Sequence, residues 1–516
     1  MDSQIFSLLL TFVFLLLIIW FLMTPQARVQ TSKPIKLLSL KLPPGPWKLP
    51  FIGNIHQLFG SLAHHKLFEL SKEYGPLMHI KLGEVSNVIV SSPEMAKEVL
   101  KTHDMDFAQR SAFLAPMIIS YGCTNIVFSP YGGYWRQLRK ICMMELLSEK
   151  RVQSFRRIRH EEVSNFIKTI SSNGRSPINL SRMIFSLTYG VTSRAAFGKK
   201  HDDQGAFISA IHKVVELAAG FSVVDMYPSI KVLQLLSGMR SKLVRLHKET
   251  DRILESIINE HRNRKTEKSS YEEDLVDVLL RLQKEGGLDF PLSDDNIKSV
   301  ILDMFSAGSD TSSTVVEWVM SELLKTPSTM RKAQEEIRQL FKGRGHADDS
   351  EIRELKFLKS VVLETMRLHP PLPLVPRECR SSCEIAGYHI PVKTKVLINT
   401  WAIGRDPKYW TEPEKFYPER FLHSSTDLKG NDFEFIPFGA GRRVCPGITF
   451  ALANIELPLA HLLYHFDWEL PNQMKHEDLD MTEAYGLVVR RKEDLFLVPV
   501  PYNPTGENTF LRMDNW

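Results

Sequence analysis

Cysteine is scarce in this chain: there are five among 516 residues, at Cys123, Cys142, Cys379, Cys383 and Cys445. An odd number without framework spacing argues against a disulfide scaffold. No CxxC pair occurs, which argues against a structural zinc site of the common kind. We therefore expect four of the five to be buried, reduced packing residues in a chain that faces a reducing compartment.

A strong excess of charge of one sign is also missing. The chain has 65 basic and 60 acidic residues, a net charge of +5, which is too weak to indicate a nucleic-acid partner. It suits a local basic patch that docks an acidic partner or an anionic membrane surface. Apolar residues make up 43% and charged residues 24%, so the composition is that of a globular protein whose core can enclose a cofactor.

Long hydrophobic runs are absent except for one near the start, at residues 5–23, which carries no charge and is long enough to span a bilayer. We predict a membrane anchor at 1–27 and a basic, proline-rich spacer at 28–54. The positive-inside rule places the rest in the cytosol, because Asp2 precedes the run and a series of basic residues follows it: Arg28, Lys33, Lys36, Lys41 and Lys48.

The remaining residues, 55–516, are predicted to form the catalytic domain. Its pattern is mainly α with small segregated β-sheets and shows no internal repeat. Strand-like stretches are expected within 77–90, 383–398 and 486–500, and examples of expected helices are 93–101, 134–147, 161–171, 243–264, 294–325, 330–340, 355–369 and 448–464.

The predicted helix at 294–325 is unusually long for a globular protein. Its middle, 308–314, consists of glycine, serine, threonine and aspartate, which are poor helix formers. Local violations of this kind tend to mark functional sites. The patch therefore indicates that something bulky packs against the middle of the helix.

The most informative segment is residues 435–447, FIPFGAGRRVCPG, followed by an apolar helix. Gly439 and Gly441 allow a tight turn, and Pro446 suits the first turn of the helix. Cys445 then sits at the helix N-terminus, where amide donors and the helix dipole favour thiolate over thiol. A thiolate in such a loop is a suitable axial ligand for iron.

This loop resembles the haem-binding loop of the cytochrome P450 family at each of its defining positions: Phe438, Gly441, Arg443, Cys445 and Gly447. Four further motifs occur in the family's order. They are the WxxxR pair Trp135 and Arg139, the helix-I segment 307–312, the ExxR pair Glu364 and Arg367, and the PERF segment with Arg420. Segments such as LPPGPWKLPFIGN and YGLVVRRKEDL are similar to those of the plant microsomal branch of the family, near its terpenoid- and alkaloid-oxidising members.

The resemblance implies the cytochrome P450 fold and a haem b cofactor with Cys445 as the axial ligand of the iron. It implies that haem propionates are held by four residues of the motifs, Trp135, Arg139, Arg377 and Arg443, with Phe438 in the cysteine loop. Asp310 and Thr311 are expected to deliver protons to bound O2. Glu364, Arg367 and Arg420 are expected to form a buried structural ion network.

The resemblance also implies candidates for the substrate pocket, at positions that line it in the family: Phe113, Leu374, Val375, Ala307 and Leu487. Their apolar character suits a lipophilic substrate. No flavin or nicotinamide motif accompanies the cysteine loop, so electrons from NADPH are expected through an NADPH-cytochrome P450 reductase. Arg136, Lys140 and Arg442 are a candidate docking patch for it.

These residues predict an endoplasmic reticulum monooxygenase that hydroxylates or epoxidises a lipophilic plant metabolite, preferably a sesqui- or diterpenoid. An alkaloid or phenolic substrate is the alternative within the family. Two other classes remain open, a haem-thiolate isomerase or dehydratase and a non-catalytic haem protein. The Asp310–Thr311 pair disfavours the first, because that chemistry needs no proton delivery to O2, and the elaborated helix-I segment disfavours the second.

Overall fold

The computed structural model describes Phe14 and residues 41–502, except 200–203, 219, 264–272, 342–343 and 345–346. The chain divides into two units, Met1–Lys41 and Leu42–Trp516, and all the elements below belong to the second. Within the described parts of the chain, no helix has the length and apolar character needed to cross a membrane. The anchor predicted at 5–23 lies, apart from Phe14, outside the described residues.

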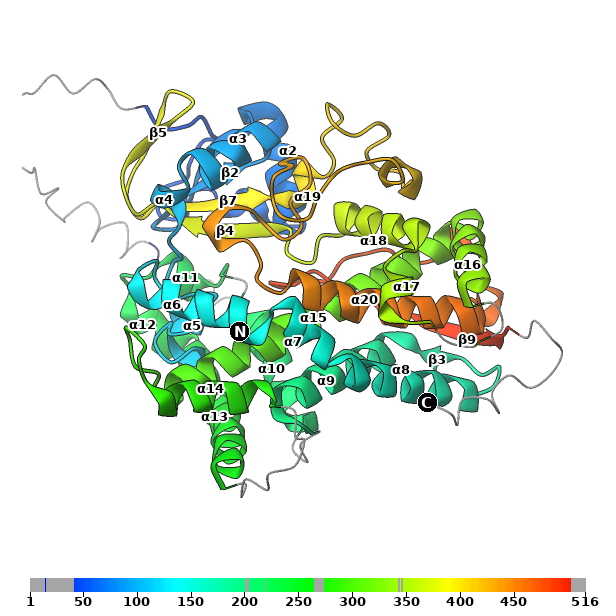
Figure 1. The fold of residues 1–516 in the computed structure, drawn as a ribbon. Coiled ribbons are helices and arrows are strands. Elements are labelled where there is room, and N and C mark those ends of the chain that lie inside the picture. Colours follow the sequence, from blue (N-terminus) through cyan, green and yellow to red (C-terminus); the bar gives the residue numbers. More distant parts are fainter. Residues whose placement is uncertain are drawn as a thin grey trace, which may run out of the picture. The chain divides into compact units, whose positions relative to one another are not determined.

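The second unit is mainly helical (Figure 1). Its α-helices are α2 (Ala63–Tyr74), α3 (Pro93–Lys97), α4 (Asp104–Phe107), α5 (Leu114–Ile119), α6 (Gly133–Ile141), α7 (Glu149–Ser154), α8 (Arg156–Ser172), α9 (Leu180–Phe197), α10 (Gln204–Leu217), α11 (Val223–Met226), α12 (Lys231–Leu236), α13 (Met239–Asn263), α14 (Leu275–Glu285), α15 (Asp294–Lys325), α16 (Pro327–Phe341), α17 (Asp349–Ile352), α18 (Lys356–Leu368), α19 (Thr400–Ile403) and α20 (Ile448–His465). Shorter 3-10 or π turns are η1 (Ile55–Leu58), η2 (Glu98–Thr102), η3 (Cys142–Leu146), η4 (Pro418–Phe421), η5 (Gly441–Arg443), η6 (Pro471–Gln473) and η7 (His476–Asp478).

Three small sheets accompany the helices. A four-stranded sheet has the order β1-β2-β7-β4, in which only the β2–β7 pair is parallel. A three-stranded sheet has the order β3-β9-β8, and β5 pairs with β6. The strands are β1 (Leu77–Leu82), β2 (Val85–Val90), β3 (Ile178–Asn179), β4 (Leu374–Glu378), β5 (Cys383–Ile385), β6 (Tyr388–Ile390), β7 (Lys395–Asn399), β8 (Phe466–Glu469) and β9 (Phe496–Pro501).

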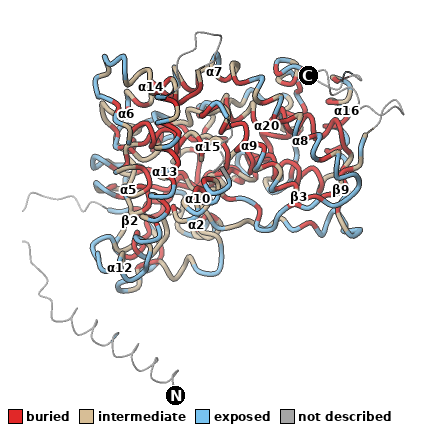
Figure 2. Tube along the Cα trace, turned by 90° about the horizontal axis from the view of Figure 1, so that it is seen from below, coloured by how far each residue is buried: buried red, intermediate tan, exposed pale blue. Residues whose placement is uncertain are grey.

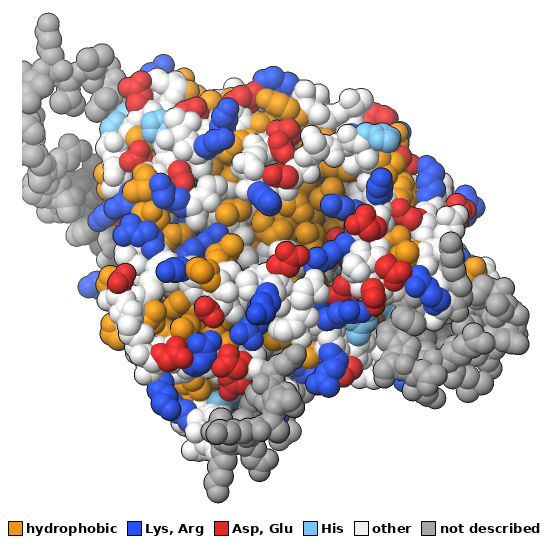
Figure 3. Space-filling view, viewed as in Figure 1, with side chains coloured by type: hydrophobic (Ala, Val, Ile, Leu, Met, Phe, Trp, Pro, Cys, Tyr) orange, Lys and Arg blue, Asp and Glu red, His pale blue; other side chains and the backbone are white. Residues whose placement is uncertain are grey.

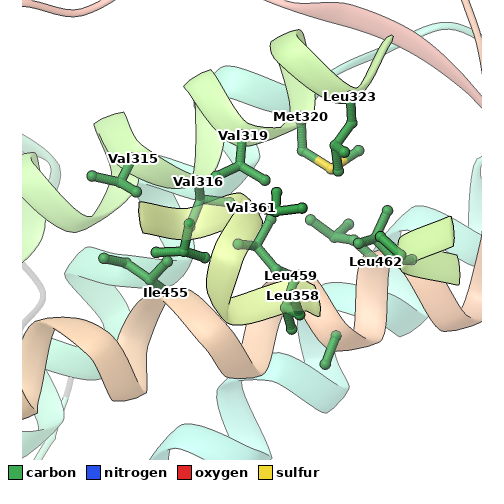
Figure 4. Packing of buried hydrophobic residues seen from close by; sticks show 14 of the residues in the cluster. Val315, Val316, Val319, Met320, Leu323, Leu358, Val361, Ile455, Leu459 and Leu462 are labelled. Atoms are coloured by element: carbon green, nitrogen blue, oxygen red, sulfur yellow. The ribbon is translucent and has the colours of Figure 1, made fainter. Parts of the chain in front are cut away.

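Helix α15 is the central element of the core. It begins with a capping box at Ser293, and most of its side chains are buried (Figure 2). Its second half supplies Val316 and Val319 to a cluster that α18 joins through Val361 and α20 through Leu459 (Figure 4). The site described below lies along the middle of α15, so this packing fixes the position of the site.

The prediction of a mainly helical fold with small separate sheets is confirmed, and the long helix has the predicted bounds, Asp294–Lys325. Among the helices of ten or more residues, α2, α9, α10 and α14 were not among the expected examples. Helix α9 is buried on most sides, including Ser181, Thr188, Thr192 and Ser193, and so lacks the apolar stripe of a surface helix. Figure 3 shows basic and acidic side chains intermixed over one face, in keeping with the small net charge.

The second part of the predicted spacer belongs to the compact unit. The amide of His79 donates to the carbonyl of Pro44 over 2.7 Å. A Cβ on Gly45 would lie 1.9 Å from the carbonyl oxygen of His79, so the chain passes directly against β1. The Asn54 side chain donates to the carbonyl of Trp47 over 2.9 Å. Residues 42–54 therefore pack on the sheet, whereas 28–40 lie outside the described residues.

We predict that Leu459→Ala lowers the free energy of unfolding by about 2–5 kcal/mol, because this fully buried side chain fills space between α15, α18 and α20. Leu236→Ala on α12 is the matched control, since that leucine is 77% exposed, and it should change stability by less than about 0.5 kcal/mol. Urea unfolding of both variants measures the difference, and equal effects would contradict this description of the core.

Candidate functional site

A cavity of about 350 Å³ lies at the junction of α15, α20, the cysteine loop and the segment before β4. We call it the central cavity. Cys445 lines one part of its wall, and Ala307 and Thr311 of α15 line another. Most of its remaining lining is apolar, including Phe450 and Leu302. The structure thus brings the predicted iron ligand and the predicted proton-delivery segment into one enclosed space.

The cysteine loop is held by its own backbone. The amide of Cys445 donates to the carbonyl of Phe438 over 3.0 Å, and the Gly447 amide donates to the Cys445 sulfur over 3.3 Å. Gly441 has a φ of 70°, and a Cβ there would lie 2.2 Å from the carbonyl oxygen of Leu100. Only glycine fits this position, because both its conformation and its surroundings exclude a side chain.

Helix α20 begins at Ile448, with Gly447 as its N-cap, so Pro446 precedes the helix instead of occupying its first turn. The sulfur therefore lies just before the helix and receives an amide donor from the cap residue. Burial nevertheless raises the pKa of the Cys445 thiol, while the Gly447 amide and Arg139 act in the opposite direction. The expected preference for thiolate is thus outweighed by burial in the protein alone, and a cation bound at the sulfur would have to supply the missing stabilisation.

Arg443 is anchored by backbone carbonyls. Its guanidinium donates to the carbonyls of Ala108, Ile126 and Ser129 over 2.8, 3.3 and 2.6 Å. It also stacks on Trp135, 4.4 Å from the ring centroid. The indole N–H of Trp135 donates to the Ile126 carbonyl over 3.0 Å, which occupies its single donor. In this structure Trp135 therefore borders the central cavity with its ring.

Two neighbouring arginines, Arg377 and Arg110, each have an N–H group without a hydrogen-bond partner among the described residues. Arg377 on β4 donates to the carbonyl oxygens of Pro376 and Ala440, each over 3.2 Å. Arg110 also donates to the carbonyl of Pro376. The Nε atoms of both arginines are buried and have no hydrogen-bond partner among the described residues. Buried donors of this kind are costly unless a ligand pairs with them.

These arginines repel one another. Burial, followed by repulsion from Arg377 and Arg139, lowers the pKa of Arg443 to about 9. Burial also lowers the pKa of Arg377, to about 10. A buried group of cations with unpaired donors is what an anionic ligand would stabilise. The two carboxylates of a haem fit this requirement, with Cys445 placed on the wall of the same cavity.

Asp310 and Thr311 both line the central cavity but bond in different directions. The carboxylate of Asp310 accepts from the Tyr189 hydroxyl over 2.5 Å, and Nε2 of His212 lies 3.4 Å from the same oxygen. The Thr311 hydroxyl donates to the carbonyl of Ala307 over 2.7 Å. The acid is therefore oriented by α9 and α10, while the hydroxyl stays on the cavity wall.

Glu364, Arg367 and Arg420 form one network away from the cavity. Arg367 pairs with Glu364 through two donors, each over 2.8 Å, and Arg420 donates to the same carboxylate over 3.0 Å. The Glu364 and Arg367 side chains are 0% exposed. Arg367 also donates to the carbonyls of Gly404 and Pro413. The network ties α18 to the segment that precedes the cysteine loop.

The substrate-pocket candidates divide between two cavities. Ala307, Val375 and Leu487 line the central cavity. Phe113 and Leu374 line a smaller cavity of about 140 Å³, which we call the outer cavity, and Leu487 borders it as well. Leu372 and Arg110 also line both, so the two spaces adjoin.

Four residues near the site were missed by the sequence reasoning: Arg110, Tyr189, His212 and Asp303. Asp303 is buried and accepts from the Asn125 side chain and from the Ile126 amide over 2.7 and 2.9 Å, which fixes the loop above Trp135. Burial raises its pKa to about 7. The sequence signal that could have identified Asp303 is its position as an aspartate on the apolar first half of the long helix, four residues before Ala307.

Comparison with known proteins agrees with this geometry. The family model for Cytochrome P450 matches residues 43–498. "Cytochrome P450 71D10" of Glycine max is 57% identical over 92% of this chain and 94% of its own length. Premnaspirodiene oxygenase of Hyoscyamus muticus is 53% identical, covering 91% and 94%, and tabersonine 6,7-epoxidase isoform 1 of Catharanthus roseus is 54% identical, covering 91% and 93%. A zebrafish cytochrome P450 solved with abiraterone superimposes with a TM-score of 0.73 and 25% identity over 86% of this chain and all of that one, 100%.

The fold and the site define a haem-binding monooxygenase, and the chain belongs to the cytochrome P450 family. The predicted recognition, enzyme class and cofactor are confirmed at this level. Membership carries a haem cofactor, O2 as substrate and electrons delivered by a reductase.

We predict that Arg367→Met lowers the free energy of unfolding by about 3–5 kcal/mol, because it leaves the Glu364 carboxylate buried without its main partner. The matched control is Lys332→Met, which removes a cation that pairs with Glu419 but is 57% exposed. It should cost no more than about 1 kcal/mol. Urea unfolding compares the two, and a similar loss in both variants would show that the buried network has no special role.

Proposed function

We propose that this chain is a microsomal monooxygenase that hydroxylates or epoxidises a lipophilic plant terpenoid, with electrons from NADPH-cytochrome P450 reductase. The observation that carries the proposal is the central cavity, where Cys445 and Thr311 share a largely apolar space bordered by buried arginines. Relatives named for the oxidation of premnaspirodiene and of tabersonine support a plant small molecule as the substrate. A terpenoid is the preferred class, and an alkaloid or phenolic compound is the alternative.

Each residue of the site has a proposed role. Cys445 would bind the haem iron, and Arg377 with Arg139 would hold the propionates, assisted by Arg110. When bound, haem with a thiolate ligand activates O2 and favours cleavage of the O–O bond. The apolar cavity walls exclude water from the substrate.

Asp310 and Thr311 are proposed to move the proton. The Thr311 hydroxyl lies on the cavity wall, and Asp310 holds a hydrogen bond to Tyr189 behind it. A carboxylate and a hydroxyl on adjacent residues of one helix can pass protons inward from the α9–α10 side.

The reductase is proposed to dock near the cysteine loop. Arg136 and Lys140 on α6 and Arg442 in the loop are exposed and basic. Arg442 is partly neutralised by Asp104, whose carboxylate lies 3.5 Å from its Nε. A patch of positive charge steers an acidic partner, and its effect falls with salt.

The bilayer is the second proposed partner. Exposed apolar side chains gather on α11 and α12 and on the segment that leads in from the N-terminus, namely Trp47, Phe51, Phe59, Val223, Ile230, Val232, Leu235 and Leu236. The Tyr227 hydroxyl donates to the carbonyl of Phe51, which joins the two groups. A patch of this kind, in a chain whose sequence also has an apolar run at 5–23, favours a lipid surface.

We predict that microsomes from cells that co-express the full chain and a plant reductase convert a terpenoid precursor to an oxygenated product in an NADPH- and O2-dependent reaction. The measurement is mass spectrometry after incubation under labelled O2 with terpene, alkaloid and phenolic precursors. Label in a terpenoid supports the proposal, and label only in an alkaloid or phenolic product moves the substrate class. Rearrangement of a hydroperoxide without NADPH would instead establish an isomerase or dehydratase.

We predict that Thr311→Val lowers the amount of product formed per NADPH consumed by at least about tenfold, since valine keeps the shape and removes the hydroxyl at the cavity wall. Ser312→Ala is the matched control, because the Ser312 hydroxyl is buried and makes no hydrogen bond among the described residues. The control should keep the wild-type ratio. An unchanged ratio in Thr311→Val would remove this residue from the proposed proton path.

A further inference from the structure

Two adjacent histidines at the start of α2 meet a glutamate from the late part of the chain. Nε2 of His64 lies 2.8 Å and Nε2 of His65 lies 3.0 Å from the same carboxylate oxygen of Glu483. These three ligand atoms lie within 4.8 Å of one another. We call the three residues the His–Glu cluster. It lies beside the outer cavity, which His64 lines, and it plays no part in the proposed haem site.

The cluster is buried but accessible from one side. The side chains of His64 and Glu483 are 4% and 7% exposed, whereas His65 is 36% exposed and faces solvent in part. Nε2 of His65 is itself buried and makes no hydrogen bond among the described residues, although it is close to the carboxylate. In this orientation the His65 imidazole does not donate a hydrogen bond to Glu483. A cation bound by both residues would lie to one side of the line between the two ligand atoms, and it would therefore use this nitrogen.

A second layer of contacts holds the cluster in place. His369, at the end of α18, approaches the other oxygen of Glu483 with Nδ1 at 3.9 Å, and its Nε2 is 2.7 Å from Glu322 of α15. The Asn399 side chain donates to the carbonyl of His64 over 2.8 Å. Outer contacts of this kind orient the ligands of metal sites and are part of their affinity.

A buried negative charge is available to a cation. The Nε2 atoms of His64 and His65 both approach the same carboxylate oxygen of Glu483, whose side chain is 7% exposed. Arg405 is the nearby opposing charge, and it is paired with Glu414 over 3.0 Å. Glu483 supplies the negative charge that an incoming ion would meet, whereas Glu322 is paired with His369 over 2.7 Å.

We propose that His64, His65 and Glu483 bind one Zn²⁺ ion, with water as the fourth ligand. Two imidazoles and a carboxylate are a donor set that zinc prefers. Tetrahedral Zn–N and Zn–O bonds of roughly 2.1 Å place such ligand atoms about 3.4 Å apart. The two N–O distances of 2.8 and 3.0 Å would need to open only slightly to admit the ion.

Zinc at this place would tie two walls of the outer cavity together. Glu483 is two residues before the turn formed by Tyr485, Gly486 and Leu487, which lines that cavity together with His64 of α2. The ion would therefore restrain the turn against the start of α2. This role is independent of the haem chemistry, so its failure would leave the proposed function intact.

The test is zinc binding by the haem-loaded full chain after dialysis against a chelator. Calorimetric titration with a zinc salt, followed by metal analysis after gel filtration, should show one ion per chain at micromolar free zinc. His65→Gln should weaken binding at least tenfold, and Glu483→Gln should do the same through a different element. His369→Asn, which removes an outer contact, should weaken it by about 10–100-fold. An unchanged ferrous carbon monoxide spectrum verifies that each variant is folded.

His103→Gln is the matched control. His103 lies with Asp106 and Cys383 in a separate group whose ligand atoms are also within 4.8 Å of one another. Zinc affinity that persists in His103→Gln and falls in His65→Gln supports the proposal. Absence of stoichiometric zinc, equal affinity in His65→Gln, or loss of binding only in His103→Gln would each overturn it.

Discussion

The position of one sulfur atom, that of Cys445, is the constraint on which the rest of the site depends. The loop that carries it can close only because Gly441 passes within van der Waals contact of the Leu100 carbonyl. The wall that shares its cavity, α15, is held in place by its packing with α18 and α20. Any shift between these elements would change the space available to a cofactor. The apolar core and the buried Glu364–Arg367 pair therefore support the chemistry indirectly, because they fix the position of Cys445 relative to α15.

Electrostatics is the second constraint. The protein alone holds a thiol whose burial raises its pKa next to arginines whose burial lowers theirs. Both effects oppose the charged forms that the site needs. An iron cation at the sulfur and two carboxylates at the arginines would reverse both at once, because each buried charge would gain a partner.

Much of this could be predicted from the sequence, because the informative segments are local. The cysteine loop, the long helix and the ExxR pair each lie within one continuous segment of the sequence. The spacing of residues within such a segment determines which side chains share a face. Contacts between distant segments could not be predicted. The pairing of Tyr189 and His212 with Asp310, and that of Arg110 with β4, depend on how α9, α10 and the sheet pack around α15. Helix α9 was missed because it is buried on most sides, which removes the periodic pattern that reveals a surface helix.

The most direct test of the account is X-ray absorption at the iron edge of the purified full chain, compared with its Cys445→Ser variant. The account predicts one sulfur ligand to iron together with the porphyrin nitrogens in the wild-type protein, and loss of the sulfur in the variant. An iron shell made only of nitrogen or oxygen donors in the wild-type chain, or sulfur ligation that survives the substitution, would contradict it.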